Sequence, residues 1–398
     1  MLDFTIDIIS LSGSRRSKAI CLAGGLTVWL LLASPRHARA EDSATYKYSD
    51  YQETASRMRI KTQSALIEQD LGTDTHLKVQ GVVDAIAGAT PNGQPAPAGS
   101  DQVVMADLHD HRKAWSGDLS RQFTGFSLDA GFANSRESDY VSNGWSFNSL
   151  FDFNQKNTTL LAGAAGTDDD VKVFYQTPWA KKHSNDVIVG ITQLLDPQTS
   201  VSFNVTWGRA TGYLNDQYKL VQKSSEVAPG VFLPNTYGEN RPQQRTKWIA
   251  FASINHSFPR LRAAIDASYR FYHDTFGVDS NTFEISWLQR LGANFILIPR
   301  LRYYDQTRAN FYYYNLDQTS IVPVAGPPNT ANPFYSSDYR LSALQSSSYG
   351  LKAVCTFASR WQVDAEYERY NMRGTDSVTP QSAYPRANIT TLGLKYSW

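Results

Sequence analysis

The chain ends in the stretch Thr391-Leu392-Gly393-Leu394-Lys395-Tyr396-Ser397-Trp398. Side chains of an extended strand alternate between two faces, so every second residue from Leu392 to Trp398 shares one face. That face is apolar or aromatic, and the residues between are small or polar. One apolar and one polar face favour a barrel strand with lipid outside and water inside.

Three residues of this stretch also match a signal. Gly393, Tyr396 and Trp398 lie where the terminal assembly signal of bacterial outer-membrane barrels, which the stretch resembles, has its glycine and aromatic positions. The alternative is an ordinary half-buried strand that ends in Trp. The resemblance implies that barrel assembly machinery, periplasmic chaperones and outer-membrane lipid are partners of the chain.

The composition is rich in aromatic residues. Aromatic side chains make up 13% of the 398 residues, with 22 Tyr and 9 Trp. Tyr and Trp suit membrane interfaces, because each ring has an apolar body and a polar tip. Carbohydrate-binding sandwiches share this composition, so composition alone does not decide between the two folds.

The N-terminus has the features of a secretory signal peptide. A basic region ends at Lys18, the apolar run Ala19–Ala33 follows, and Ala38-Arg39-Ala40 is a small-residue cleavage motif. The alternative, a signal anchor, needs about 20 apolar residues, and this run is shorter. We therefore expect residues 1–40 to be a leader cleaved after Ala40.

Charge and cysteine content exclude several classes of protein. The formal net charge is +1, and removing the leader takes away more basic than acidic residues, which excludes a strongly basic nucleic-acid-binding protein. Only Cys355 follows the leader, so no intrachain disulfide is expected. No later run is long and apolar enough for a membrane helix. No nucleophile-elbow or phosphate-loop motif occurs, so we expect neither a cofactor nor enzymatic activity.

Alternating patterns then run along most of the chain. We expect a flexible polar lead at residues 41–56 and a single barrel domain at residues 57–398, whereas residues 101–119 carry no clear pattern. The candidate strands are Arg57–Gln69, His76–Ile86, Ser120–Ala133, Asp139–Phe153, Asn157–Ala165, Asp186–Leu194, Thr199–Gly212, Arg245–Ser257, Arg262–Tyr272, Asn281–Arg290, Asn294–Tyr304, Ser347–Ala358, Trp361–Asn371 and Asn388–Trp398.

The connections between these strands alternate in length. The tight ones are Asn154–Lys156, Asp196–Gln198, Phe258–Leu261, Leu291–Ala293 and Ser359–Arg360. The longer ones are Gly166–Asn185, Tyr213–Gln244, His273–Ser280, Asp305–Ser346 and Met372–Ala387. Outer-membrane barrels have short periplasmic turns and long extracellular loops. The sequence therefore predicts an all-β, antiparallel transmembrane β-barrel of about 14 strands, with 12 or 16 as alternatives, in the outer membrane.

Several short stretches resemble an uncharacterised barrel family, domain of unknown function 3570. They are Val83–Pro91, Glu137–Tyr140, Asn157–Leu160, Gly212–Asp216, Asn240–Pro242, Arg300–Tyr304 with Gln306, and Asp338–Leu341. The chain departs from the family pattern at Gln217, Thr275-Phe276 and Asn281. The resemblance implies an outer-membrane location and no particular activity. It also implies an association with flavin-transferase and thioredoxin-like proteins, hence periplasmic redox partners.

The polar faces of the candidate strands carry charges of both signs. The predicted lumen-facing residues are Arg262, Asp266, Arg270, Glu284, Arg290, Arg300, Arg302, Lys352, Asp364, Glu366, Glu368 and Lys395. A charge that faces lipid at the midplane costs about 2–4 kcal/mol, so these charges are expected to face inward. They form either a polar passage or a lumen closed by ion pairs, and the mixture of signs predicts no strong ion preference.

Three other motifs carry weaker predictions. Asp107, His109 and His111 share a strand face and contain ligand types that bind zinc or copper, although a polar loop is the alternative. Asp168-Asp169-Asp170 offers calcium ligands, or a solvated turn. Asn255-His256-Ser257 contains the residue types of outer-membrane phospholipases, but adjacent strand residues point to opposite faces and cannot converge as a triad.

These observations predict a passive channel or an envelope structural barrel. The alternative is a barrel that docks periplasmic redox or flavin-maturation partners, and an outer-membrane hydrolase is the third reading. Cys355 alternates with apolar residues in Tyr349–Phe357, so we expect its thiol to face lipid.

Overall fold

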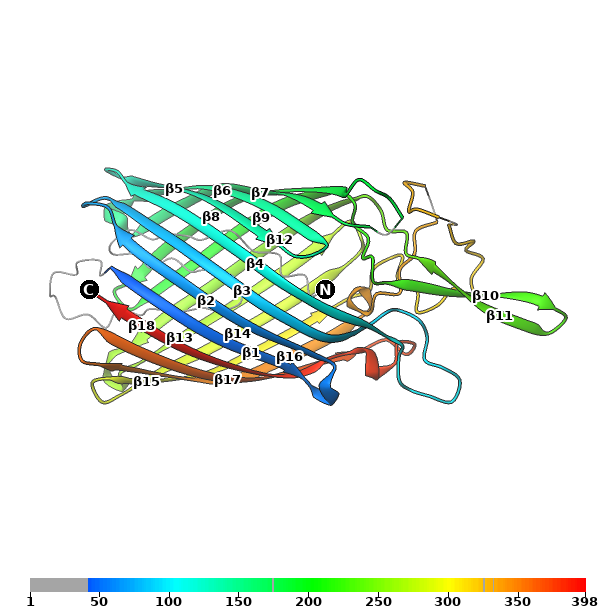
Figure 1. Cartoon of the computed structure of the whole chain (residues 1–398). Coiled ribbons are helices and arrows are strands. Elements are labelled where there is room, and N and C mark those ends of the chain that lie inside the picture. Colours follow the sequence, from blue (N-terminus) through cyan, green and yellow to red (C-terminus); the bar gives the residue numbers. More distant parts are fainter. Residues whose placement is uncertain (1–41, 174, 325, 332) are drawn as a thin grey trace.

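The structure, a computed structural model, describes residues 42–398 except 174, 325 and 332. It is a closed barrel of sixteen antiparallel strands with a separate two-stranded hairpin (Figure 1). Around the barrel the strands follow the order β1-β18-β17-β16-β15-β14-β13-β12-β9-β8-β7-β6-β5-β4-β3-β2. The predicted signal peptide lies outside the described residues.

The strands are β1 (Ser43–Glu53), β2 (Met58–Asp70), β3 (Thr75–Pro91), β4 (Met105–Gln122), β5 (Phe126–Arg136), β6 (Tyr140–Phe153), β7 (Thr158–Val171), β8 (Ala180–Asp196), β9 (Thr199–Gly212), β10 (Leu220–Ala228), β11 (Val231–Gly238), β12 (Gln244–Phe258), β13 (Ala263–Asp274), β14 (Asp279–Leu291), β15 (Phe295–Gln306), β16 (Leu344–Phe357), β17 (Trp361–Gly374) and β18 (Arg386–Ser397). Single 3-10 turns are η1 (Thr54–Ser56), η2 (Asn154–Lys156), η3 (Pro259–Leu261), η4 (Tyr339–Leu341) and η5 (Gln381–Ala383). None of the described helices has the length and apolar character needed to span a membrane.

The barrel prediction is confirmed, and the predicted strands recur with shifted ends. Two barrel strands were missed, β1 and β4. The predicted flexible lead is wrong for residues 43–53, because β1 pairs with β18 along its length and closes the barrel. Its outward face carries Asp50 and Gln52 as well as Tyr46, which explains why alternation alone did not reveal it.

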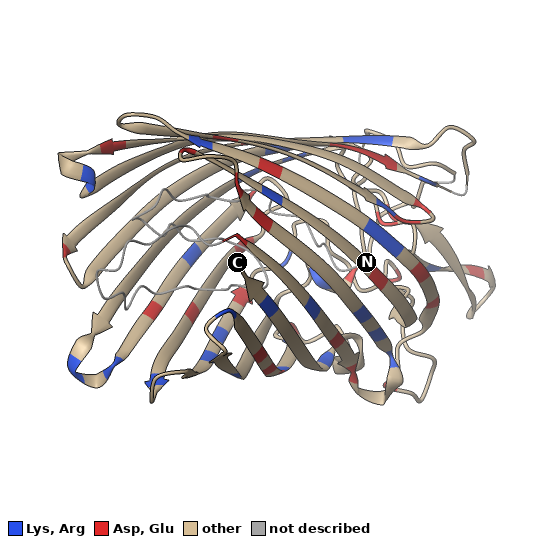
Figure 2. Ribbon diagram, turned by 60° about the vertical axis from the view of Figure 1, so that its left-hand side comes forward, with Lys and Arg blue, Asp and Glu red and all other residues tan. Residues whose placement is uncertain are grey.

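Exposed apolar side chains form a belt around the outside. They alternate along each strand with inward residues, as Leu301 (52% exposed) and Tyr303 do with the intervening Arg302. Strand pairing aligns these residues across neighbours, for example Tyr349 with Leu301. Figure 2 shows strands that are largely uncharged, interrupted by short bands of both signs. Such a belt is the surface that a membrane barrel presents to lipid.

The two ends of the barrel differ. At one end, here called the turn end, connections of two to four residues join the strands and the chain terminates at Trp398. At the other, the loop end, the connections include residues 213–243 and 307–343. The hairpin β10–β11 belongs to the first of these loops and projects away from the barrel (Figure 1).

The buried apolar side chains gather at the loop end. One cluster contains Phe276, Phe311 and Leu341, and another contains Tyr339 and Tyr384. Because these residues come from the connections or from the strand ends next to them, the hydrophobic core of the described chain lies in the loops. The barrel interior below is mostly polar, and the inward apolar side chains include Ile188, Phe251 and Leu288.

Candidate functional site: a polar lumen under interlocked loops

Inward-facing charges on β14 to β17 form ion pairs along one wall of the lumen. Arg302 lies 2.8 Å from Glu284 and Arg300 lies 2.7 Å from Glu366. Lys352 lies 3.4 Å from Asp364, and both side chains are almost fully buried. Arg302 with Glu284 and Lys352 with Asp364 join neighbouring strands, as cross-strand pairs that stabilise a sheet do, whereas Arg300 reaches across β16 to Glu366.

The structure places the predicted lumen residues as follows. All of them except Arg262 occupy strand positions that alternate with the outward apolar belt. These residues are Asp266, Arg270, Glu284, Arg290, Arg300, Arg302, Lys352, Asp364, Glu366, Glu368 and Lys395. Arg262 differs, because it lies in the turn after η3 with φ of 50° and donates to the Gly292 carbonyl. A left-handed residue is needed there to turn the chain into β13, so Arg262 is not a strand residue.

The predicted charges fall into a paired and an unpaired group. Lys395 shares Glu68 with Lys78 at 3.6 and 3.7 Å. The unpaired group contains Asp266, Arg270, Arg290 and Glu368. None of these side chains forms an ion pair within 4.0 Å with another described residue. Both signs are thus available to a solute.

Sequence analysis missed further inward charges on the opposite side of the ring. Arg112 of β4 lies 2.5 Å from Asp84 of β3, and Lys247 lies 2.9 Å from Asp186. The alternation was visible in β4, where Lys113 and Trp115 face outward and Arg112 faces inward. The nearby histidines, which also face outward, hid the apolar pattern of that face.

A second wall, from β5 to β9, is mostly small and neutral. Its inward residues include Ser146, Asn148, Ser202 and Asn204. Asn148 leans over Gly163, where an added Cβ would lie 2.2 Å from its amide oxygen, so the glycine makes room for the carboxamide. The lumen therefore has one strongly charged wall and one weakly charged wall.

Loops from distant strands meet over the loop end. Lys219, in the β9–β12 loop, is 1% exposed and donates to the Pro91 carbonyl and the Thr90 hydroxyl at the end of β3. The neighbouring Leu220 amide donates to the Asn92 carbonyl over 2.7 Å. Since β9 and β3 are six places apart in the ring, this loop crosses the mouth of the barrel.

We name residues 90–93, 216–220, 239–241 and 336–340 the loop cluster. Gly93 allows its closest approach: with φ of 88°, an added Cβ would lie 2.3 Å from the Ser337 hydroxyl and 2.5 Å from the Leu220 carbonyl. Ser337 also donates to that carbonyl. The β3–β4, β9–β12 and β15–β16 connections therefore contact one another at this glycine.

The loop cluster buries three acidic and three basic side chains. Arg340 binds Asp338 over 2.8 and 2.9 Å and also contacts Asp216. Arg241 lies 2.7 Å from Glu239 and 2.9 Å from Asp338. Lys219 completes the set. Buried charges are retained at low cost only when each is paired and hydrogen-bonded. The two arginines pair with the three acidic side chains, whereas Lys219 is held by hydrogen bonds to Thr90 and Pro91.

The pKa values of these groups reflect the network. Burial raises the pKa of Glu239 to about 7, with Asp216 and Asp338 adding to the effect and Arg241 opposing it. Burial acts in the same direction on Asp338, but Arg340 and Arg241 outweigh it and hold the pKa of Asp338 well below its ordinary value. Burial lowers the pKa of Lys219. Glu239 is thus the member that changes charge near neutral pH.

The three weaker motifs are not assembled into sites. Asp107, His109 and His111 are exposed on the outward face of β4, and ligand atoms of these three do not lie within 4.8 Å of one another. The predicted turn at residues 168–170 is wrong, because these residues belong to β7. Asp169 faces inward to Lys182, whereas its neighbours face outward, so the three carboxylates cannot share an ion.

One acidic group was missed by sequence analysis. Carboxylate oxygens of Asp110, Glu137 and Asp139 lie within 4.8 Å of one another at the loop end. Burial and the two neighbouring aspartates raise the pKa of Glu137 to about 7. Asp139 accepts from Tyr218 and Gln217, and Asp110 from Ser138, so hydrogen-bond donors already occupy much of this group.

His256 lies on the outward face of β12 near the turn end. Its Nδ1 is 2.8 Å from the Thr199 hydroxyl, which donates to Asp196, and its ring packs against Phe258. Asn255 and Ser257 alternate with it on β12 and face the other side.

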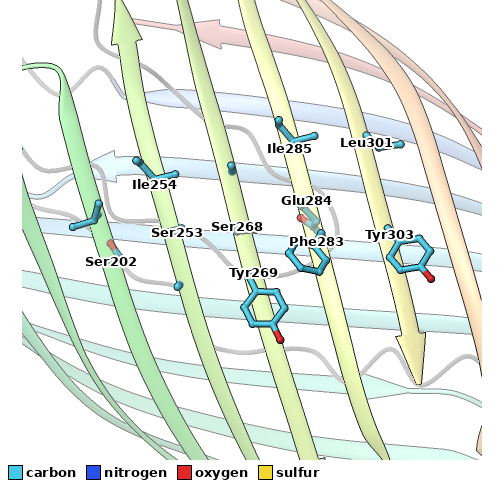
Figure 3. A pocket seen from close by; sticks show the side chains of 13 residues that line it. Ser202, Ser253, Ile254, Ser268, Tyr269, Phe283, Glu284, Ile285, Leu301 and Tyr303 are labelled. Atoms are coloured by element: carbon cyan, nitrogen blue, oxygen red, sulfur yellow. The ribbon is translucent and has the colours of Figure 1, made fainter. Parts of the chain in front are cut away.

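An open groove also lies on the outward face, with a volume of about 590 Å³. Its apolar lining includes Ala252 and Ala267, and Figure 3 shows Tyr269, Phe283 and Tyr303 side by side on adjacent strands. The groove belongs to the lipid-facing belt and is separate from the lumen.

The stretches that resemble a known family meet at the loop end. Val83–Pro91, Gly212–Asp216, Asn240–Pro242 and Asp338–Leu341 all end in or beside the loop cluster, and Glu137–Tyr140 contacts it through Asp139. These segments are far apart in the sequence, so folding is what brings them together.

Solved structures with a similar overall shape are outer-membrane proteins. They include a bacterial polysaccharide outer membrane secretin (8% identity, 90% of this chain and 98% of that chain, TM-score 0.47). Two others are the CymD monoaromatic hydrocarbon channel (11% identity, 91% and 89%, TM-score 0.41) and OmpT of Vibrio cholerae (12% identity, 90% and 97%, TM-score 0.41). At these identities and TM-scores the likeness carries no argument about this chain.

Sequence comparison identifies the family. No curated protein matches the chain. The sequence pattern of a family described as "Protein of unknown function (DUF3570)" matches residues 29–185 and 175–398. These two matches extend over the whole barrel and both walls of the lumen, and the chain therefore belongs to the DUF3570 family.

Proposed function

We propose that this protein is a passive outer-membrane channel for small polar solutes, with a mouth that is narrowed by the loop cluster. The observation that carries the proposal is the closed ring of sixteen strands around a polar interior. Barrels of about eight strands are filled by side chains, whereas those of 16–18 strands leave an aqueous channel. The loops that cross the loop end then set how much of that channel is open.

The proposed orientation follows from the two ends. Outer-membrane barrels keep short turns in the periplasm and long loops outside the cell. The turn end, with Trp398, is accordingly periplasmic, and residues 213–243 and 307–343 face the medium. Protease added to intact cells should cut these loops, and cutting only after permeabilisation would reverse the orientation.

The charges of the lumen support weak ion selectivity. Most charges on β14 to β17 neutralise one another in pairs, and the unpaired ones, Arg290 and Glu368, have opposite signs. A ring of one sign would select cations or anions, and none is formed by these residues. Small neutral or zwitterionic solutes fit this lumen best.

Conductance in planar bilayers tests the proposal. The folded protein should give small, weakly selective channel steps. A variant in which residues 310–340 are replaced by a short Gly-Ser linker should give larger steps, because that segment includes residues 336–340 of the loop cluster. A variant lacking only the projecting hairpin tip, residues 226–232, is the matched control and should conduct like the wild type. Absence of conductance from both the wild type and the loop-deleted variant would contradict the channel proposal.

Docking of a periplasmic redox partner and a hydrolase activity were the alternatives from sequence. The described turn-end connections contain two to four residues each and offer little surface for a partner. His256 has Thr199 and Asp196 as neighbours but faces outward, away from the lumen. Neither alternative gains a specific observation.

A further inference from the structure

The outward face of the barrel carries an uneven distribution of charge at the loop end. Among the adjacent strands β17, β18, β1, β2, β3, β4 and β5, five carry outward basic residues toward the loop end: β17, β18, β2, β4 and β5. We name this set the outer basic band: Arg59, Lys61, His109, His111, Lys113, Arg136, Arg369, Arg373 and Arg386. Among the described outward positions of the same strands, the acidic residues are Asp50 and Asp107.

The band lies at the border of the apolar belt. On β4 the outward residues run from the exposed Leu119 and Trp115 to Lys113 and His111. On β17 the exposed Tyr367 is followed two residues later by Arg369. In a membrane this level is the headgroup region, where basic side chains sit at little cost beside an aromatic ring.

Strand register brings the basic residues close together. Lys113 of β4 is directly opposite Arg136 of β5. Arg59 of β2 and His109 of β4 flank Ala87 of β3 in one row. Neighbouring strands lie about 4.8 Å apart, so the backbones of Arg59 and His109 are separated by about 10 Å.

The next row repeats the arrangement with Lys61 and His111 on either side of Ala85. The two alanines leave a shallow track between basic walls. A phosphate group between these rows is within reach of Arg59 and Lys61 on one side and faces the imidazoles of His109 and His111 on the other. Arginine and lysine bind phosphate through charge-assisted hydrogen bonds.

Most of these cations are not neutralised by the protein. Lys113 and Arg136, which repel each other as a like-charged pair, make no ion pair or hydrogen bond with another described residue. Arg59 does pair with Asp50, at 2.5 Å. Like charges directly opposite each other destabilise a sheet, so their juxtaposition favours an external anion.

The other half of the ring shows that the band is not a general feature of the loop end. There, outward charges are balanced within the protein: His183 lies 2.5 Å from Asp168, Lys181 contacts Asp170, and His273 lies 2.6 Å from Asp279. Among the described outward residues at the loop end of that half, Arg209 is a basic residue without an ion pair, and acidic residues match the basic ones in number.

We propose that the outer basic band is a binding site for the phosphate groups of a phosphorylated glycolipid in the surrounding leaflet. The acyl chains of such a lipid would lie against the belt below, beside Val79, Val83 and Trp115. The proposal rests on the proposed membrane location and orientation, and it assigns the Asp-x-His-x-His stretch of β4 to lipid recognition in place of metal binding.

Lipid retention tests this site. Folded barrel is purified from detergent containing an equimolar mixture of bisphosphorylated lipid A, its dephosphorylated form and phosphatidylglycerol, and bound lipid is counted by native mass spectrometry. The wild type should retain the bisphosphorylated lipid preferentially. The triple variant Lys61→Gln, Lys113→Gln, Arg136→Gln should retain at least about tenfold less, because each lost phosphate contact is worth about a factor of ten.

The matched control changes two basic residues of the other half, Lys181→Gln with Arg209→Gln, and should retain lipid like the wild type. Arg209 is exposed on the outward face of β9 and donates to the Gln244 carboxamide over 2.9 Å. Heat-modifiable mobility shows that each variant is folded, and the single variant Arg136→Gln, with a smaller loss, serves if the triple variant does not fold. Equal retention of all three lipids, equal loss in the control, or displacement by inorganic phosphate alone would overturn the proposal.

Conductance is measured in parallel to separate the lipid site from the proposed function. Failure of the channel with preserved lipid selectivity refutes the proposed function only. Unselective lipid retention with normal conductance refutes the lipid site only.

Discussion

The two ends of the barrel are built from different interactions. At the turn end, connections of two to four residues reverse the chain with left-handed backbone positions, such as Gln155 (φ 55°) and Ser359 (φ 56°). At the loop end, long connections are held by buried ion pairs and apolar clusters, with Asp338 and Tyr335 almost completely inaccessible.

This difference teaches where each property of the molecule resides. The turn end is defined by local backbone geometry and by the aromatic border of the belt, and both features bear on insertion into the membrane. The loop end depends on contacts between segments far apart in the sequence, such as Arg340 with Asp216. Changes at the turn end should therefore affect assembly, and changes at the loop end should affect the open area of the lumen.

The largest effect is expected from Trp398→Asp at the turn end. Trp398 stacks on Tyr396 with ring centroids 5.9 Å apart, and Tyr396 packs against Trp361, so the terminal residue extends an aromatic border. Aspartate removes that anchor and, with it, the last residue of the assembly signal that the sequence predicts. Heat-modifiable protein in the membrane fraction should fall severalfold.

The matched control for Trp398→Asp is Ser397→Asp, because Ser397 faces inward on the same strand and is already polar. It should insert normally. Normal insertion of the Trp398 variant would show that the turn end does not direct assembly.

The same contrast explains what the sequence could and could not predict. Belt strands such as β9 were predicted with their observed ends, because lipid on one side and water on the other imposes strict alternation. Strand β4 was missed because the outward face of its loop-end half carries His109 and His111, where other strands carry apolar residues. The longer strands β7 and β8 extend beyond the belt, where no membrane imposes a pattern.

The loop cluster had no comparable signal. Its charged residues lie in short segments without periodicity, and Asp216 and Arg340 are 124 residues apart. A buried network of this kind depends on the relative position of strands around the ring, and no local property of the chain encodes that position. The resemblance stretches were the one hint, since several of them converge there.

The second largest effect is expected from Arg340→Ala at the loop end. Its removal leaves Asp338 and Asp216 buried with fewer cations, and breaking a buried ion pair costs about 3–5 kcal/mol. The loops should separate locally while the barrel stays inserted. Single-channel steps should become larger, and added protease should cut residues 307–343 faster.

The control for that variant is Arg308→Ala, since Arg308 lies in the same loop, is exposed and makes no ion pair with a described residue. It should leave both readouts unchanged. Conductance and protease resistance equal to wild type in the Arg340 variant would mean that the loop cluster does not narrow the mouth.

A smaller, graded effect is expected from pH through Glu239. Its pKa of about 7 exceeds the ordinary carboxyl value, so the closed loops hold a proton that opened loops release. This contribution to stability is fully present below the ordinary carboxyl pKa and is lost as pH rises through about 7. Steps should therefore be larger at pH 8 than at pH 5.

Glu239→Gln is the matching variant, because the amide mimics the protonated carboxyl beside Ser336, Arg241 and the Asp216 amide. It should remove most of the pH dependence. A wild-type channel with no pH dependence between 5 and 8, or an undiminished dependence in the variant, would contradict this role.

The smallest effect is expected from Cys355→Ala, which probes the belt close to the turn end. Cys355 is paired with Phe295 on one side and Val363 on the other, both outward residues. A small apolar side chain replaces a small, weakly polar one at a surface packed by lipid, so insertion and conductance should stay unchanged. A side chain packed against hydrocarbon is shielded from charged reagents, because a charge is costly inside the membrane. In the folded, inserted barrel, Cys355 should react slowly with a charged, membrane-impermeant maleimide and faster with a small apolar reagent. Rapid labelling by the charged reagent would place this part of β16 outside the belt. The lipid-facing belt would then end closer to Lys352, and Cys355 would belong to the turn end.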